Sequence, residues 1–341
     1  MISPTAHRTV VVAVGGNALL RGGPHATIAE QMAAARTLAV PVTGLLDAGW
    51  RVVVTHGNGP QVGFIQRRAD LVRELAPELP ALELDMCVAD AQGSLGYILA
   101  VAIAGRLRAL GRDPGRVAAL LTHTLVDADD PAFGRPTKPI GAHYDEATAH
   151  RLAAEHGWSV APEPGRGWRR VVPSPRPRRI LEASSVRTLS DAGCTVIAGG
   201  GGGIPLVETA DGGLRGVAAV IDKDLTSALL AADLDAGLLV ITTGVERVAV
   251  DFGGPGQRFL DRLTPTESQL LLDQGEFPEG SMGPKIRAAL DFVSGAPHRR
   301  ALITSPGALP AALEGQGGTW LEHGPAAPAH REGPLTAGRP Q

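Results

Sequence analysis

Lysine is rare in this chain, and its three positions are the first indication of chemistry. The 341 residues include 32 lysines and arginines, of which only Lys138, Lys223 and Lys285 are lysines. Arginine presents a rigid planar fork, whereas lysine presents a compact charge that can follow a moving anion. A lysine kept against this background is a candidate for work that arginine cannot do, although chance explains any one of them equally well.

The residues around each lysine favour a role in anion binding. Lys223 lies between Asp222 and Asp224 at the expected start of a helix, where the carboxylates can steer it or hold Mg²⁺. Lys285 follows a proline in an expected first helical turn, where the helix dipole disfavours a cation unless an anion binds nearby. Lys138 stands between prolines, which present it stiffly. The alternatives are a capping aspartate beside a solvated lysine at 223 and solvated lysines elsewhere.

Three glycine-rich turns follow apolar segments that are typical of buried strands. These turns are Gly15-Gly16-Asn17, His56-Gly57-Asn58-Gly59 and Gly199-Gly200-Gly201-Gly202-Gly203. Glycine allows backbone N–H groups to approach phosphate oxygens closely, and a following helix N-terminus adds a favourable dipole. Turns between strands and helices often contain glycine for other reasons, but three such turns together favour phosphate binding.

Several common kinds of site do not fit the sequence. The dinucleotide fingerprint does not match Gly15-Gly16-Asn17, and the Walker A motif is excluded because no Gly-Lys pair occurs. No Ser-His-Asp arrangement or zinc-ligand spacing is evident. Phosphoryl transfer does fit, because it needs positioning and charge neutralisation more than covalent catalysis. An acceptor that is already an anion, such as a carboxylate or carbamate, needs no general base.

Alternating strand and helix patterns must position these residues. Buried strands are expected at 9–14, 51–55, 117–122, 194–198, 217–221, 237–242, 300–304 and 318–321, with a hairpin-like stretch at 245–250. Helices are expected at 27–48, from 61, and at 85–110, 178–192, 224–233, 265–274, 284–294 and 308–314. This order predicts an α/β fold, an open αβα sandwich with a mainly parallel central sheet. In such sheets ligands bind at the carboxyl ends of the strands.

The composition favours a cytoplasmic enzyme with a small-molecule substrate. Hydrophobic residues make up 44%, and the formal net charge of −3 gives no indication of a nucleic-acid partner. Cys87 and Cys194 have no disulfide or metal pattern, so both are expected to be thiols. No signal peptide precedes the first strand, and no run approaches the roughly 20 apolar residues of a membrane span.

The chain resembles the carbamate kinases, within the amino acid kinase fold. The resemblance is carried by VVAVGGNALL (11–20), VVVTHGNGPQVG (52–63), QGSLGYILA (92–100), DPAFGRPTKPIG (130–141), GWRRVVPSPRP (167–177), VIAGGGGGIP (196–205), VIDKDL (220–225) and GSMGPK (280–285). It implies the reaction of ATP with carbamate to give ADP and carbamoyl phosphate, often run toward ATP in arginine breakdown. It also implies a homodimer and Mg²⁺ held mainly by the nucleotide.

The resemblance implies one domain over 9–323, and the composition of residues 324–341 predicts a disordered tail. Its N-lobe, about 9–205, would bind carbamate and the phosphoryl group and would contain a protruding subdomain at about 127–176. Its C-lobe, about 206–323, would bind the nucleotide.

The resemblance also implies roles for individual residues. Catalytic roles fall to Lys138, Lys223, Lys285 and Asp222. Phosphate or acceptor binding falls to Gly15, Gly16, Asn17, Gly57, Asn58, Gly59, Gly201 and Gly202. Nucleotide binding falls to Lys223, Asp224, Thr242, Thr243, Val245, Met282, Gly283, Pro284 and Lys285.

Some positions depart from the pattern of the carbamate kinases. Ala91 replaces a usual hydroxyl residue, Gly134 a common lysine, Ala142-His143 a usual Pro-Phe, and Ala218 a frequent glutamate. These changes leave the lysines and glycine turns intact, but they bear on the choice of acceptor. A kinase for another small carboxylate and a nucleotide-binding regulator without turnover therefore stay open as alternatives.

Overall fold

The computed structural model describes residues 7–15, 19, 27–76, 78–163 and 165–324. Its centre is an eight-stranded sheet in the order β15-β17-β16-β12-β1-β2-β9-β3. The strands are β15 (Arg262–Leu263), β17 (Thr319–Leu321), β16 (Arg300–Thr304), β12 (Leu238–Thr242), β1 (Thr9–Val14), β2 (Arg51–His56), β9 (Thr195–Ile197) and β3 (Val117–Ala119). Within this sheet β16 and β17 pair antiparallel and the other neighbours pair parallel, which confirms the predicted architecture.

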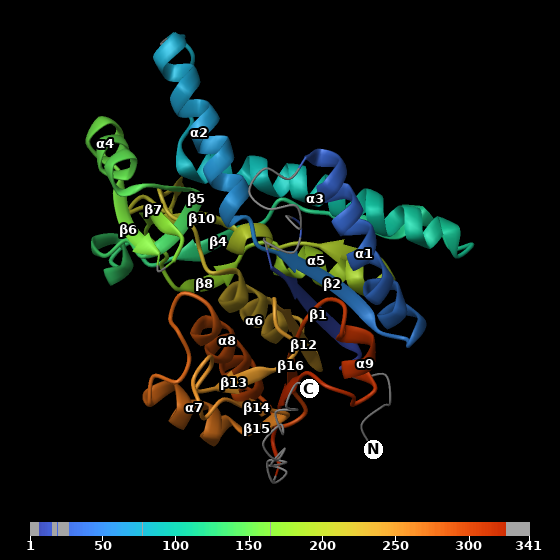
Figure 1. Cartoon of the computed structure of the whole chain (residues 1–341). Helices are drawn as coiled ribbons and strands as arrows, with labels where there is room; N and C mark the ends of the chain where they lie inside the picture. Colours follow the sequence, from blue (N-terminus) through green and yellow to red (C-terminus); the bar gives the residue numbers. More distant parts are fainter. Residues whose placement is uncertain (1–6, 16–18, 20–26, 77, 164, 325–341) are drawn as a thin grey trace, which may run out of the picture.

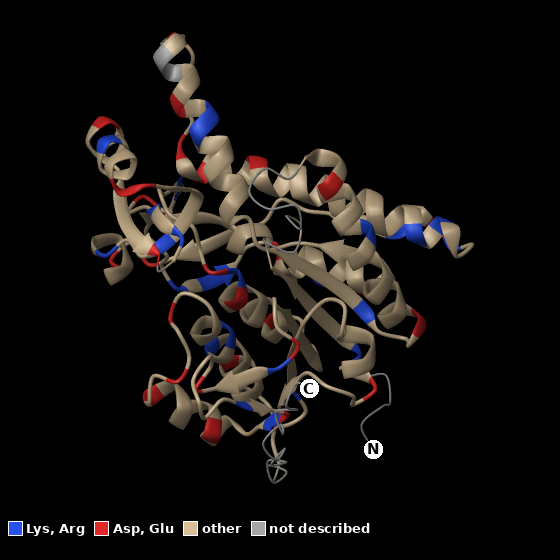
Figure 2. Cartoon of the chain, viewed as in Figure 1, with Lys and Arg blue, Asp and Glu red and all other residues tan. Residues whose placement is uncertain are grey.

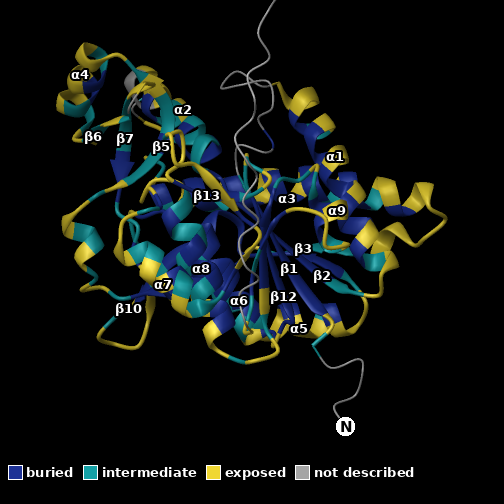
Figure 3. Cartoon of the chain, turned by 60° about the horizontal axis from the view of Figure 1, so that its bottom comes forward, coloured by how far each residue is buried: buried dark blue, intermediate teal, exposed yellow. Residues whose placement is uncertain are grey.

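Helices cover both faces of this sheet, as Figure 1 shows. One face packs on α1 (Ile28–Asp47), α3 (Leu84–Ala109) and α9 (Leu309–Leu313), and the other on α5 (Ala183–Asp191), α6 (Lys223–Asp233) and α8 (Met282–Ser294). The structure also describes α2 (Gly59–Leu75), α4 (Glu146–His156), α7 (Pro265–Asp273) and the 3₁₀ turns η2 (Pro114–Arg116), η3 (Pro131–Gly134) and η4 (Gly200–Gly202). Figure 3 shows the strands as a buried layer between the helices.

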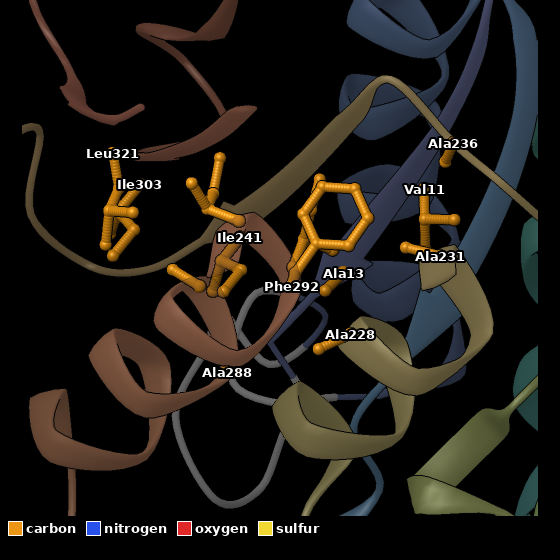
Figure 4. Packing of buried hydrophobic residues seen from close by; sticks show 14 of the residues in the cluster. Val11, Ala13, Ala228, Ala231, Ala236, Ile241, Ala288, Phe292, Ile303 and Leu321 are labelled. Atoms are coloured by element: carbon orange, nitrogen blue, oxygen red, sulfur yellow. The ribbon is translucent and has the colours of Figure 1, made fainter. Parts of the chain in front are cut away.

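Alternate residues of β1 supply two separate cores. Val10, Val12 and Val14 point to the α1 and α3 side, whereas Val11 and Ala13 point to the α6 and α8 side. This follows from the two-residue period of a strand. Figure 4 shows the second core, in which the ring of Phe292 packs among small and branched side chains from β1, α6 and β12. The core holds few aromatic residues because α6 and α8 supply alanines that let the helices lie close to the sheet.

Three smaller sheets accompany the large one among the described residues. They are β11 (Leu214–Gly216), β10 (Ile204–Glu208), β4 (His123–Val126) and β8 (Pro177–Ile180); β5 (Lys138–Tyr144), β7 (Gly167–Val172) and β6 (Ser159–Glu163); and β13 (Val248–Val250) with β14 (Arg258–Leu260). The sheet of β5, β7 and β6 carries α4 and lies against α2 (Figure 1). Glycines make this contact possible, since a Cβ on Gly63 would lie 1.9 Å from the Cα of Gly141.

The apolar run at 217–221 is not a strand, contrary to the sequence-based prediction. Ala219, Val220 and Ile221 are buried, at 1% exposure or less, which accounts for their apolar character. Their backbone bonds go to irregular segments instead of a ladder; for example, the N–H of Val220 donates to Pro173 O at 3.0 Å. Burial alone therefore produced a strand-like pattern.

Two other predicted boundaries are wrong. The expected helix at 178–192 begins as β8, which pairs antiparallel with β4, and only 183–191 is helical. The expected strand at 117–122 ends at Ala119 as β3 of the large sheet, and the next strand, β4, begins only at His123 and belongs to another sheet. Helix α1, by contrast, continues through Pro41.

Helix α3 is more apolar than the sequence reading allowed. Of the helices that the structure describes, it alone is long and apolar enough to cross a membrane by length and composition, and 56% of its most apolar window is buried. Leu95, Leu99 and Ile103 pack into the core beneath α1. A core helix passes the same compositional test, so this helix is weak evidence for a membrane span.

Candidate functional site

The predicted glycine turns lie side by side at the carboxyl ends of neighbouring strands. The order β12-β1-β2-β9 places Thr242, Gly15, Gly57 and Gly199 at one edge of the sheet. Gly15 N–H donates to Thr242 Oγ1 at 3.4 Å, and Gly57 N–H donates to Val14 O at 2.8 Å. Gly16 and Asn17 fall outside the described residues.

The glycine run after β9 is required by the backbone and by its neighbours. Gly201 and Gly202 have φ of +65° and +90°, a region that other residues rarely adopt. A Cβ on Gly201 would lie 2.0 Å from Asn58 Nδ2, and one on Gly202 would lie 2.5 Å from Ile221 O. These glycines therefore let the second and third turns meet, whatever they bind.

Two amide side chains, one in the second turn and one in the first turn of α2 after it, have hydrogen-bonding atoms without a partner among the described residues. Asn58 and Gln61 are 2% and 7% exposed. Asn58 Nδ2 and both amide atoms of Gln61 have no hydrogen-bond partner among the described residues. Because buried polar groups are nearly always paired, these amides are candidates for ligand contacts. The sequence reading missed Gln61, whose only signal was its place three residues after Asn58.

The three lysines meet in one cluster with two aspartates. Lys138 Nζ lies 2.5 Å from Asp222 Oδ2, and Lys285 Nζ lies 2.9 Å from Asp224 Oδ2. Lys223 Nζ donates to Asp224 Oδ1. Charged residues of both signs are interspersed over the described chain (Figure 2), so this cluster is distinguished by its burial. The side chains of Lys223 and Asp224 are 10% and 4% exposed.

Local structure explains how α6 presents its charged residues. Asp222 is the N-cap of α6, and its Oδ1 accepts from Asp224 N–H at 2.8 Å. That capping fixes the first turn and directs Lys223 and Asp224 inward. Lys285 occupies the first turn of α8, where the helix dipole is unfavourable for a cation. The carboxylate of Asp224 offsets this by pairing with Lys285. Lys138 begins β5, so this lysine alone arrives from the three-stranded sheet.

The pKa values of the cluster reflect competition between burial and pairing. Burial raises the pKa of Asp224, but the charges of Lys223 and Lys285 outweigh it and hold that pKa well below its ordinary value. Burial, assisted by the charge of Lys285, lowers the pKa of Lys223 despite Asp224. For Lys285, Asp224 outweighs burial and raises the pKa. The cluster thus holds three cations against two carboxylates, which favours an anionic ligand.

The candidate nucleotide residues lie around the same edge. Thr242 is buried, and its hydroxyl donates to Ala13 O at 3.1 Å, so it braces β12 against β1. Thr243 N–H donates to Thr304 O at 2.9 Å, and Val245 is half-buried in the loop that follows. Met282, Gly283, Pro284 and Lys285 form the first turn of α8. The structure thus brings the described candidates to one region.

His56 lies beside the cluster and is fully buried. Burial, then the nearby charge of Lys223, lowers its pKa to about 4, although a bond to Gly57 O opposes this. The neutral form therefore persists in the folded state at pH 5, whereas the unfolded chain is protonated. A group whose folded pKa is depressed in this way loses stability as pH falls from about 6.5 toward 4.

We expect the free energy of unfolding to fall by about 2 kcal/mol between pH 7 and pH 5 through His56 alone. Urea unfolding of the wild type and of His56→Gln at both pH values measures this difference, with the exposed His150→Gln as a control. The loss should shrink in His56→Gln and persist in His150→Gln. Equal losses in all three proteins would contradict the assignment.

The chain is similar to known proteins over nearly all of its length. The amino acid kinase family model matches residues 8–305. A carbamate kinase of Thermococcus kodakarensis is 44% identical over 313 residues, which cover 92% of this chain and 98% of the relative. The carbamate kinase-like protein YahI of Escherichia coli has the same identity and coverage. The structure of carbamate kinase from Giardia lamblia bound to AMP-PNP matches with a TM-score of 0.82 and 38% identity, covering 93% of this chain and 99% of that one.

Proposed function

The chain belongs to the amino acid kinase family, and on that premise we propose that it is a carbamate kinase that transfers a phosphoryl group between ATP and carbamate. The cluster of Lys138, Lys223 and Lys285 around Asp222 and Asp224 carries this proposal. Three cations at the carboxyl edge of a parallel sheet, of which Lys223 is buried and the other two are half-buried, suit the negative charge of a transferring phosphoryl group.

The acceptor is proposed to be an anion because the cluster offers no free base. Each carboxylate is already paired with lysine, and the neutral His56 is fully buried beside Gly57. A carbamate oxygen is nucleophilic without losing a proton, so the reaction needs neutralisation of charge more than proton removal. The lysines would reduce the repulsion between the acceptor and ATP.

We assign the roles of individual residues by their positions. Lys223 would stabilise the transferring phosphoryl group, Lys285 would hold nucleotide phosphates, and Lys138 would reach the site from the three-stranded sheet. Asp222 and Asp224 would fix the lysines. Phosphoryl and acceptor contacts are assigned to Gly15, Gly16, Asn17, Gly57, Asn58, Gly59, Gly201 and Gly202. Nucleotide contacts are assigned to Thr242, Thr243, Val245, Met282, Gly283 and Pro284.

We further propose that the kinase domain spans 9–323, with an acceptor lobe at about 9–205 and a nucleotide lobe at about 206–323. The excursion at about 127–176 is proposed as the subdomain that carries Lys138 to the site. Its separate sheet of β5, β7 and β6 supports this division.

The use of ATP implies Mg²⁺, and the carboxylates of the site fit an ion held mainly by the nucleotide. Asp222 Oδ1 caps α6 and Oδ2 pairs with Lys138, while the two oxygens of Asp224 pair with Lys223 and Lys285. Bound with ATP, Mg²⁺ would neutralise phosphate charge and orient the phosphates. Asp222 and Asp224 would contact it through water at most.

We also propose that the chain forms a homodimer, that it lies in the cytoplasm and that it acts in arginine breakdown. Exposed apolar side chains support a dimer face on α1 and α3: Val40, Tyr97 and Val101 are 47%, 61% and 45% exposed beside a hollow between these helices. Free thiols at Cys87 and Cys194 suit a reducing compartment. Light scattering should give twice the chain mass, and a monomer at micromolar concentration would contradict the dimer.

The test of the proposed function is ATP formation from ADP, carbamoyl phosphate and Mg²⁺ by the purified chain. Rapid ATP formation is expected, and it should not occur with acetyl phosphate at a comparable rate. Efficient use of another acyl phosphate would instead favour a kinase for a different small carboxylate, which the changes at Ala142 and His143 motivate. ADP binding without turnover on any acyl phosphate would favour a regulator.

A further inference from the structure

A second group of polar side chains lies at the amino ends of the strands, opposite the lysine cluster. His7 precedes β1, Asp235 lies between α6 and β12, and His298 lies between α8 and β16. His7 Nδ1 is 2.8 Å from Asp235 Oδ2, and His298 Nε2 is 3.3 Å from Asp235 Oδ1. Among the described residues, this is the group whose His, Cys, Asp or Glu ligand atoms all lie within 4.8 Å of one another.

We propose that His7, Asp235 and His298 form a binding site for a late first-row divalent metal ion such as Zn²⁺. Two imidazoles and one carboxylate are a ligand set that such ions bind, with water filling the fourth position. Tetrahedral coordination at zinc bond lengths places ligand atoms about 3.3–3.5 Å apart. The 3.3 Å between His298 Nε2 and Asp235 Oδ1 has that spacing, whereas the 2.8 Å between His7 Nδ1 and Asp235 Oδ2 is a hydrogen-bond distance that would lengthen when the ion binds.

The two imidazole rings need a modest movement to bind the ion. Their centroids are 3.7 Å apart and their planes are inclined by 23°. Rotation about the side-chain bonds would make the nitrogens converge, and the rings have room for it because the side chains of His7 and His298 are 27% and 31% exposed. The ion would then replace the present bonds to Asp235.

The backbone supports a site held in place by the fold. His7 and Asp235 have φ of +66° and +51°, and only one other described non-glycine residue, Asp251, has a positive φ. Such conformations cost free energy and tend to persist at functional sites. Two of the three proposed ligands therefore occupy unusual backbone conformations that the surrounding fold holds in place.

The surroundings set the affinity that we expect. Arg299 Nη2 lies 3.7 Å from Asp235 Oδ1, where it can orient the carboxylate. Its positive charge opposes a cation, so we expect micromolar binding and not the tight binding of a structural zinc site.

The location gives the site a consequence for the proposed catalytic centre. Its ligands lie at the far ends of β1, α6 and α8, the elements that carry Gly15, Lys223 and Lys285. A bound ion would join these three elements at the edge opposite the lysine cluster. The site would therefore have a structural role and would not hold the Mg²⁺ of ATP.

Zinc titration of metal-free full-length protein tests the proposal. Calorimetry with Zn²⁺ should give one ion per chain, and a thermal melt should show stabilisation by Zn²⁺ but not by Mg²⁺. His7→Gln and His298→Gln keep an amide that can bond to Asp235, yet each should weaken zinc binding at least tenfold. His150→Gln, an exposed histidine elsewhere, should bind zinc as the wild type does.

Binding of Co²⁺ supplies a readout that does not depend on the variants folding. Its absorption spectrum in the wild type should show nitrogen and oxygen ligands without a thiolate charge-transfer band, which separates this site from Cys194. The proposal is overturned if the wild type takes up no zinc at micromolar concentration, if cobalt shows thiolate ligation, or if both folded glutamine variants bind zinc unchanged.

Discussion

Replacing Lys223 with alanine is expected to lower the rate of ATP formation from ADP and carbamoyl phosphate by about 10³-fold or more. Lys223 is almost fully buried at the start of α6, and its charge has no substitute among the other residues of the cluster because Lys138 and Lys285 contact different carboxylate oxygens. A charge that acts on the transferring phosphoryl group contributes more to the transition state than to the bound substrates. ADP affinity should therefore change less than tenfold.

Two further variants make this measurement specific. Lys223→Arg keeps the charge, but the larger planar fork does not fit the space beside Asp224, so we expect at least a tenfold loss of rate. Arg179→Ala removes an exposed cation and should leave the rate unchanged. A Lys223→Ala enzyme with a rate within tenfold of the wild type would remove Lys223 from the proposed transition state.

The sequence was informative where function depends on local pattern. Asp222, Lys223 and Asp224 are consecutive, and the N-cap of α6 fixes their mutual positions through a hydrogen bond between residues two positions apart. Such a short-range arrangement can be predicted directly from the sequence. The alternation of buried strands with helices likewise predicted the parallel sheet, because strands covered on both faces are continuous apolar runs.

Long-range contacts were beyond the same reasoning. Lys138 and Asp222 are 84 residues apart, and only their chemistry suggested that they share a site. The apolar run at 217–221 resembled a strand, although its backbone makes only isolated hydrogen bonds, from Val217 to Pro205 in β10 and from Val220 to Pro173 in a loop. The proposed metal site draws on three separate loops, at His7, Asp235 and His298, so no spacing in the sequence indicates it. Each of these contacts depends on tertiary structure, about which local sequence pattern carries little information.

Ala142 and His143 depart from the family pattern, and the sequence alone related them to the choice of acceptor. In the structure His143 Nε2 lies 3.0 Å from Glu163 Oε2, which joins β5 to β6 across the three-stranded sheet, and Arg169 lies against the same carboxylate. Any effect of His143 on acceptor choice would therefore act through the position of this sheet, and hence of Lys138.

Replacing Asp224 with asparagine is expected to affect both stability and activity. The substitution preserves shape but leaves the buried Lys223 and the half-buried Lys285 without their shared carboxylate. Removing one partner of a buried ion pair costs about 3–5 kcal/mol because the remaining charge is uncompensated. We expect urea unfolding to show a loss of that size and the rate to fall at least 100-fold, because Asp224 positions both lysines. Asp191→Asn, which breaks an exposed pair with Arg51, should cost less than about 1 kcal/mol.

The thermal stabilisation of Asp224→Asn by ADP distinguishes two roles for the lysine cluster. The cluster either binds nucleotide phosphates or only stabilises the fold through its ion pairs. In the wild type, the phosphates of ADP must compete with the carboxylate for Lys285. In the variant Lys285 lacks that partner, so ADP should raise the midpoint temperature of unfolding by more than it does in the wild type. An equal or smaller shift, measured at the same ADP concentration in both proteins, would mean that nucleotide phosphates do not take the place of Asp224 beside Lys285.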